Sequence, residues 1–291
     1  MSATPKIKVS LDDGKMWQDY VKATTSPTSP TTTTTTTTIP PTAIVMHANW
    51  LSNAEFDQIA NSLTATDQVQ YRCTNYPTGY NEERAKHVMT YKSKGLKIGI
   101  DVGYYNNVTQ NASKFKSLGY DVVDYNIEAA FDGPNADSEA ANNVEKIRKA
   151  SQAAKQAGLL FRISPGRPNS TSFMRTKLLD DVAKLVDHYH IQCQTMQDTT
   201  PEEYANFTES VAKILRAANP KIVVTSQVSP AQGAAPGKIL QQTMRDVIVA
   251  SMAKPAPGNT NGVRMWIGGK DVQEASSFFS WFKAAYKTKT T

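Results

Sequence analysis

Residues 119–128 read GYDVVDYNIE, a short run in which apolar and polar side chains alternate. The apolar set is Val123, Tyr125 and Ile127, and the polar set is Asp124, Asn126 and Glu128. Because successive side chains of a strand point to opposite faces, the run predicts a strand with one apolar face and one polar face. Packing of the apolar face against a helix is the basic arrangement of an α/β fold.

Strand-like and helix-like segments alternate on both sides of this run. The predicted strands are residues 43–49, 69–73, 97–102, 122–128, 159–164, 188–194, 221–228 and 263–267. The predicted helices are centred on residues 55–63, 82–94, 112–118, 137–157, 172–186, 201–218, 238–252 and 272–286. Eight strands, each followed by a helix, fit either a doubly wound sheet or a (β/α)₈ TIM barrel. The count of eight favours the barrel.

The composition changes sharply at residues 24–42, TTSPTSPTTTTTTTTIPPT. Thr and Pro do not bury a core, and Pro disrupts helices and strands alike, so we expect a disordered linker. Thr/Pro-rich stretches also occur as glycosylated stalks of exported proteins, and a plain spacer is the alternative. Residues 1–23 are too short to fold alone and are expected to form an attachment segment that docks on a tethering partner. The barrel domain is then residues 43–291.

Several classes of function are disfavoured by composition. The chain of 291 residues has a net charge of +6, but its Lys and Arg residues are scattered, which predicts a solvated basic surface and no nucleic-acid partner. No stretch of about 18 apolar residues occurs, so we expect no membrane span. The two cysteines, Cys73 and Cys193, lack metal-binding spacing, and no metal or cofactor is expected. Residues 1–17 lack the apolar core of a secretory signal; the linker nevertheless suggests an extracellular, cell-surface or particle-surface protein.

The polar faces of the strands are expected to fill the barrel interior, here called the lumen. They comprise His47 and Asn49; Gly99, Asp101 and Gly103; Asp124, Asn126 and Glu128; Arg162 and Ser164; His188, His190, Gln192 and Gln194; and Arg264 and Trp266. Barrel lumens are normally filled by Val, Ile and Leu, and buried charges are costly unless paired. We expect Arg162 and Arg264 to balance Asp101 and Asp124. Such a network either only holds the barrel together or supports a ligand site at the C-terminal mouth, where sites in this fold lie.

Glu128 is the best candidate for a catalytic acid, because it is the outermost polar residue of the fourth strand. Asn126 lies on the same face and is placed to hydrogen-bond a substrate group beside it. A general acid needs a raised pKa, which burial or a negative neighbour such as Asp124 can provide.

The fourth strand resembles the D-x-x-D-x-D-x-E motif of glycoside hydrolase family 18, the chitinase family. Asp121, Asp124 and Glu128 match this motif, and Asn126 stands at its third acidic position. Other segments are similar in the same order, closest to the plant-type, hevamine-like branch: KIGIDVG to the S-x-G-G strand, FRISPGRP to A-A-P-x-x-P, HIQCQ to V-Q-F-Y-N, and GVRMWIGG to GVMLWS. The resemblance covers residues 43–270, at low identity throughout.

The resemblance implies substrate-assisted hydrolysis of an N-acetylhexosamine-containing glycan. Glu128 would protonate the glycosidic oxygen while the substrate's own N-acetyl oxygen attacks the anomeric carbon. The neighbouring Asp and Tyr roles would fall on Asn126 and Gln194, and Trp266 would stack on the sugar. Asn in place of Asp removes charge stabilisation, although family 85 endo-N-acetylglucosaminidases use an Asn-x-Glu pair.

Two functions therefore follow from the sequence. One is a glycosidase with Glu128, Asn126 and Asp124 as catalytic residues. The other is a lectin-like or structural surface module that kept the barrel and lost turnover. Both involve glycan contact, for which the sequence predicts the following residues: Trp266, Gln194, Gln192, Asp101 and Asn49.

Overall fold

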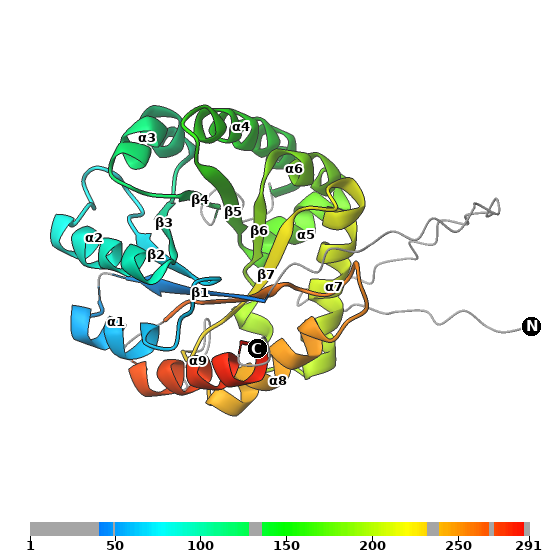
Figure 1. The fold of residues 1–291 in the computed structure, drawn as a ribbon. Coiled ribbons are helices and arrows are strands. Elements are labelled where there is room, and N and C mark those ends of the chain that lie inside the picture. The colour runs from blue at the N-terminus through cyan, green and yellow to red at the C-terminus, as the bar shows by residue number, and fades with distance from the viewer. Residues whose placement is uncertain (1–40, 49, 128–135, 232–238, 268–270, 288–291) are drawn as a thin grey trace, which may run out of the picture. The chain divides into compact units, whose positions relative to one another are not determined.

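The computed structural model describes residues 41–48, 50–127, 136–231, 239–267 and 271–287. Its eight parallel strands hydrogen-bond in sequence order, and β1 also pairs with β8, which closes the barrel (Figure 1). The strands are β1 (Thr42–His47), β2 (Gln68–Arg72), β3 (Lys97–Val102), β4 (Val122–Ile127), β5 (Leu160–Pro165), β6 (His188–Ile191), β7 (Val223–Val228) and β8 (Gly262–Met265). The predicted (β/α)₈ fold is confirmed, with β1 beginning one residue before the predicted start.

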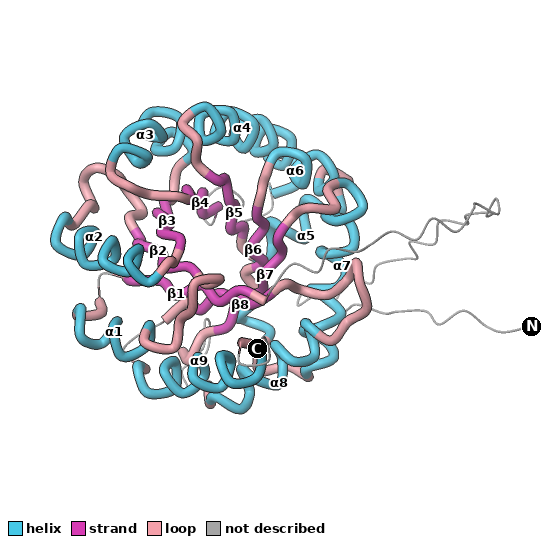
Figure 2. The backbone as a smooth tube through the Cα atoms, in the orientation of Figure 1, coloured by secondary structure: helices cyan, strands magenta, loops and turns pink. Residues whose placement is uncertain are grey.

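Helices form a ring around the strands (Figure 2). They are α1 (Asn53–Ala60), α2 (Glu82–Met89), α3 (Tyr105–Ser117), α4 (Ala136–Gln156), α5 (Arg167–Arg175), α6 (Leu179–Leu185), α7 (Pro201–Ala218), α8 (Gln241–Met252) and α9 (Val272–Tyr286), with short 3₁₀ turns η1 (Thr90–Lys94) and η2 (Gln194–Met196). Ser52 and Thr200 form capping boxes that start α1 and α7. The helix predicted over residues 172–186 is instead two helices, because Lys177 between them has a left-handed φ of 59°.

The alternation of the strands separates a helix-facing apolar layer from a polar lumen. On β5, Phe161 and Ile163 belong to the hydrophobic core, whereas the side chain of Arg162 lies in the lumen and bonds Asp124, its register partner on the neighbouring strand β4. On β8, Met265 lies in the hydrophobic core and Arg264 in the lumen. The polar lumen predicted from these strands is confirmed.

The prediction for β1 is wrong at His47, which faces the helices. Its ring stacks on Phe56 of α1, with centroids 4.3 Å apart, and meets His87 of α2 edge-on. The register pairs Ile44 with Gln68 and Met46 with Gln70, so Ile44 and Met46 are on the lumen face of β1. The residues of β1 before His47 are almost all apolar and show no alternation. The polarity of His47 alone was therefore a poor guide to the face of the strand on which it lies. Asn49 lies outside the described residues.

The predicted attachment segment (residues 1–23) and the linker as far as residue 40 lie outside the described residues. Within the part of the chain that the structure describes, none of the helices combines the length and apolar character needed to cross a membrane.

Closure of the barrel between β8 and β1 requires glycine at position 262. Gly262 has a φ of 152°, and a Cβ there would lie 2.0 Å from the carbonyl oxygen of Thr42, its partner on β1. We therefore expect Gly262→Ala to lower the free energy of unfolding by about 3 kcal/mol or more. Urea unfolding followed by circular dichroism measures this effect.

Gly158→Ala is the matched control, because Gly158 has a φ of 72° but its added Cβ meets only Lys116 Cε, at 3.9 Å. Backbone strain alone should cost this variant about 1 kcal/mol. Equal losses in the two variants would contradict the steric explanation for Gly262.

Candidate functional site

Four charged side chains, Asp101, Asp124, Arg162 and Arg264, form a charge network within the lumen. Asp124 accepts hydrogen bonds from Arg162 Nε at 2.9 Å and lies 3.3 Å from Arg264 Nη1. Arg264 Nη2 donates to Asp101 at 2.5 Å. All four side chains are buried, so the sequence-based pairing of two arginines with two aspartates is confirmed.

Neutral neighbours complete the hydrogen bonding of Asp124. Gln70 Nε2 donates to it at 2.7 Å and Ser164 Oγ at 2.8 Å. Burial by itself raises the pKa of Asp124, but the positive charges of Arg162 and Arg264 outweigh burial and hold that pKa below its ordinary value. The Asp124 carboxylate is therefore ionised, and its charge is compensated within the network.

A chain of hydrogen bonds through two histidines lies beside this network. His190 Nε2 is 2.8 Å from Gln227 Oε1, and its Nδ1 is 2.9 Å from Thr225 Oγ1. Since the amide oxygen only accepts, His190 donates from Nε2 and accepts at Nδ1. Burial, and then the nearby arginines, lower the pKa of His188 and of His190 well below the ordinary value. Both rings are therefore neutral.

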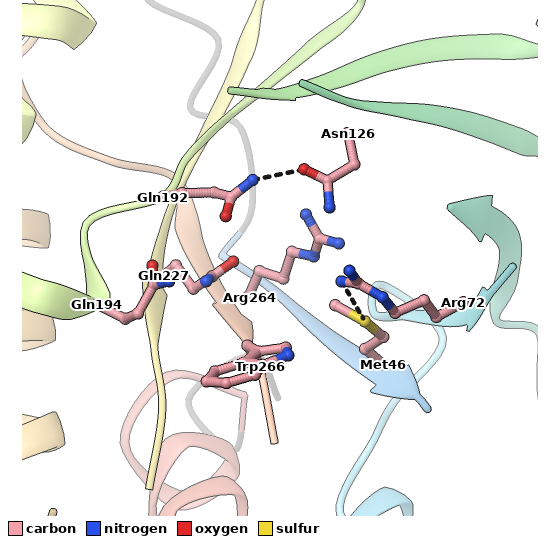
Figure 3. A pocket seen from close by; sticks show the side chains of 8 residues that line it. All are labelled: Met46, Arg72, Asn126, Gln192, Gln194, Gln227, Arg264 and Trp266. Atoms are coloured by element: carbon pink, nitrogen blue, oxygen red, sulfur yellow. Dashed lines mark hydrogen bonds between the residues drawn. The ribbon is translucent and has the colours of Figure 1, made fainter. Parts of the chain in front are cut away.

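A cavity of about 220 Å³ opens at the C-terminal ends of the strands, and we call it the mouth cavity. Figure 3 shows the side chains around it. They are Met46, Arg72, Asn126, Gln192, Gln194, Gln227, Arg264 and Trp266. Four of these eight residues carry amides, two carry guanidinium groups, and no carboxylate occurs among them.

The orientation of the Asn126 amide follows from its neighbours. Gln192 Nε2 donates both to the backbone carbonyl of Ser164 and, at 2.7 Å, to Asn126 Oδ1. A backbone carbonyl only accepts, so the nitrogen of Gln192 must be the atom that faces both partners. The Oδ1 of Asn126 therefore accepts a hydrogen bond from Gln192, and its Nδ2 donor faces the mouth cavity (Figure 3).

An indole pair lies at the rim of the mouth cavity. Trp266, directly after β8, lines the cavity, and Trp50 meets it edge-on with ring centroids 6.3 Å apart. Trp50 Nε1 donates to the carbonyl of Ile267 at 2.6 Å, which fixes the ring. Trp266 therefore has a packed neighbour that holds it in place beside the cavity.

The predicted site residues separate into three groups. Asn126, Gln192, Gln194 and Trp266 come together around the mouth cavity. Asp101 and Asp124 belong to the charge network and are absent from the cavity lining. Glu128 and Asn49 lie outside the described residues.

Four lining residues were not among the predicted site residues: Met46, Arg72, Gln227 and Arg264. Arg264 was expected in the lumen, but only as a partner of the aspartates. Arg72 and Gln227 stand on strands whose alternation was readable: QVQYRC on residues 68–73 and VTSQV on residues 224–228 place them on the polar face. Arg72 Nη1 lies 4.0 Å from Met46 Sδ on one wall of the cavity. Met46 offered no such signal, because it belongs to an apolar run.

No family model and no curated protein sequence matches the chain. Solved structures match across most of it. The glycoside hydrolase domain of PgaB (BpsB) from Bordetella bronchiseptica is 6% identical with a TM-score of 0.56, covering 83% of this chain and 99% of that one. A chitinase from Chromobacterium violaceum is 11% identical with a TM-score of 0.54, covering 82% and 99%.

Barrels of other activities match almost as well. Triosephosphate isomerase from Bartonella henselae is 13% identical with a TM-score of 0.51, covering 86% of this chain and 100% of that one. At these identities the similarities establish the (β/α)₈ fold, and the function has to be argued from the site.

The neutral histidines make stability depend on pH. The unfolded chain takes up protons on its histidines as the pH falls below about 6.5, whereas folded His188 and His190 do not. We therefore expect the free energy of unfolding to decrease below about pH 6.5, by up to about 1.4 kcal/mol per pH unit for each histidine. Asp124, whose pKa is lowered, titrates only at more acid pH.

Urea unfolding between pH 8 and 5 tests this dependence. The variant His190→Gln removes one of the titrating rings and should show a shallower decrease than the wild type. A profile that stays flat in both proteins would contradict the assignment of neutral buried histidines.

Proposed function

We propose that the barrel binds a glycan containing N-acetylhexosamine at the mouth cavity. The observation that carries the proposal is the placement of Trp266 beside a cavity walled by the amides of Asn126, Gln192, Gln194 and Gln227. Amide groups donate to and accept from hydroxyl and acetamido groups, whereas an indole face covers the apolar C–H face of a sugar ring. The resemblance of the strands to glycoside hydrolase family 18 supports the same class of ligand.

The size and unsatisfied atoms of the cavity agree with a small polar ligand. Its volume of about 220 Å³ lies below the roughly 300–1,000 Å³ of drug-sized sites and suits a single sugar ring. Gln194 Oε1 and Arg264 Nε are buried and have no hydrogen-bond partner among the described residues. Because buried polar groups are normally paired, hydroxyl groups of a bound sugar are natural partners for them.

Hydrolysis with Glu128 as the acid is the second candidate function. It is favoured by the position of Asn126, which faces the mouth cavity two residues before Glu128 in the chain. In that reaction Glu128 protonates the glycosidic oxygen, and the acetamido oxygen of the substrate attacks the anomeric carbon. The attack makes the acetamido N–H more positive, so an acceptor beside it assists the step.

The orientation of Asn126 supports the proposal of binding more than that of hydrolysis. Its Oδ1 is engaged by Gln192, so it presents a donor where assisted attack needs an acceptor. Asp124 supplies no free negative charge, because two arginines compensate it.

We also propose that residues 24–41 form a spacer, one residue shorter than the sequence predicts because Thr42 already belongs to β1, and that residues 1–23 form an attachment segment, which would hold the barrel at the surface of a cell or particle. The Thr/Pro composition of residues 24–42 supports this arrangement.

Glycan binding should depend on Trp266. We expect calorimetry with a chito-oligosaccharide to show binding by the wild type, and Trp266→Ala to weaken it at least about tenfold, since truncated aromatic anchors typically cost more than 1.4 kcal/mol. Leu160→Ala is the control, because Leu160 is exposed at the opposite, N-terminal end of β5. Equal affinity of wild type and Trp266→Ala would show that the sugar does not occupy the mouth cavity.

Turnover should depend on Glu128. We expect the wild type to release reducing sugar slowly from the same oligosaccharide, and Glu128→Gln to abolish this release, because loss of a general acid costs about 10²–10⁴-fold. Calorimetry on Glu128→Gln should still show binding. A wild type that binds but releases nothing would exclude hydrolysis and leave the binding function.

A further inference from the structure

Asn126 and Gln192 form a hydrogen-bonded amide pair on the wall of the mouth cavity, and this pair offers one donor and one acceptor. Gln192 Nε2 donates to the backbone carbonyl of Ser164 and, at 2.7 Å, to Asn126 Oδ1. The other atom of each amide, Gln192 Oε1 and Asn126 Nδ2, points into the cavity (Figure 3). Exchange of the two atoms in either amide would set like groups against each other, so the acceptor and the donor are fixed in place.

The polar groups of an N-acetylhexosamine match the amide pair to different extents. An acetamido group has a donor and an acceptor, but its N–H and C=O point in opposite directions across a trans amide. It therefore cannot bond both cavity-facing atoms from one side. Each hydroxyl group both donates and accepts. Two neighbouring hydroxyls of one ring can bond both atoms together, one donating to Gln192 Oε1 and the other accepting from Asn126 Nδ2.

Burial makes the amide pair selective. Asn126 is 4% exposed and Gln192 5% exposed, so a ligand that fills the cavity removes the remaining water from both amides. A ring that lacks one of the two hydroxyls then leaves a buried donor or acceptor without a partner, which is unfavourable. A site built to bond a hydroxyl rejects an analogue without that hydroxyl for this reason.

The requirement for two neighbouring hydroxyls defines which residue of a glycan fits. In N-acetylglucosamine these can only be the 3-hydroxyl and the 4-hydroxyl, because the carbon on one side of them carries the acetamido group. In a 1,4-linked chain only the residue at the non-reducing end keeps both hydroxyls free. The cavity volume of about 220 Å³, which suits a single ring, agrees with a chain end.

We propose, building on the glycan-binding function above, that the mouth cavity holds the non-reducing terminal residue of its glycan. The amide pair recognises the two adjacent free hydroxyls of this residue. The acetamido group is then left to the other amides of the cavity, Gln194 and Gln227. A glycan whose terminal residue is substituted on either hydroxyl is rejected.

Calorimetry with chitobiose and three analogues tests the proposal. The analogues lack the 3-hydroxyl, the 4-hydroxyl or the 6-hydroxyl of the non-reducing ring. We expect loss of the 3-hydroxyl or of the 4-hydroxyl to weaken binding at least about tenfold. Loss of the 6-hydroxyl, which lies outside the adjacent pair, should have a much smaller effect.

Binding of chitobiose with no such difference among the analogues would overturn the proposal and leave glycan binding intact. A loss for only one of the two adjacent hydroxyls would also overturn it, because a single hydroxyl would then be recognised. Failure of chitobiose to bind would overturn both the proposal and the glycan-binding function.

The variant Asn126→Ala tests the role of the amide pair. It removes the donor, while Gln192 keeps its bond to the carbonyl of Ser164. One of the two deoxy analogues should therefore bind this variant as tightly as chitobiose does, so that the ratio of their affinities falls to about one. Asn61→Ala, the same change at the exposed residue directly after α1, should keep the ratios of the wild type.

Ratios in Asn126→Ala that equal those of the wild type would overturn the role of Asn126. If Asn126→Ala does not fold, the analogue series on the wild type decides the proposal by itself.

Discussion

The pairing of Asp124 with Arg162 and Arg264 is the interaction on which the rest of the lumen depends. Each of these groups is fully buried, and an unpaired buried charge costs several kcal/mol, so none is tolerable without the others. The sequence makes room for the pairing at Gly99, where a Cβ would lie 3.3 Å from Arg162 Nη2. Two arginines and two aspartates balance, so the barrel holds a polar interior without net charge from this network.

The charge network also determines which polar groups line the mouth cavity beside it. The hydroxyl of Ser164 donates to Asp124, which fixes Ser164. The backbone carbonyl of Ser164 then orients the amide of Gln192, and this amide orients Asn126. The carboxylates of Asp101 and Asp124 are thereby used for structure, while amides and an indole line the mouth cavity. A residue that matches a catalytic motif in the sequence thus acts here as a counterion.

Much of the polar lumen was predictable from the sequence, because the alternation of apolar and polar residues along the strands determines which side chains face it. The period of two on β5, β6 and β8 identified the lumen side chains, and the need to pair buried charges predicted the arginine–aspartate network. Alternation fails where a strand is apolar on both faces, as before His47, and helix periodicity does not reveal the left-handed backbone of Lys177. Sequence also does not show which atom of an amide is already engaged, and this atom decides whether Asn126 accepts or donates.

The same electrostatics bear on catalysis. A carboxyl group at the mouth acts as a general acid near neutral pH only if its pKa is raised. Asp124 brings no uncompensated negative charge to the mouth cavity, because two guanidinium groups pair with it. The described lining of the mouth cavity consists of amides, guanidinium groups, a methionine and an indole, while Asp101 and Asp124 are paired within the charge network, and this division agrees with the proposed binding of a sugar.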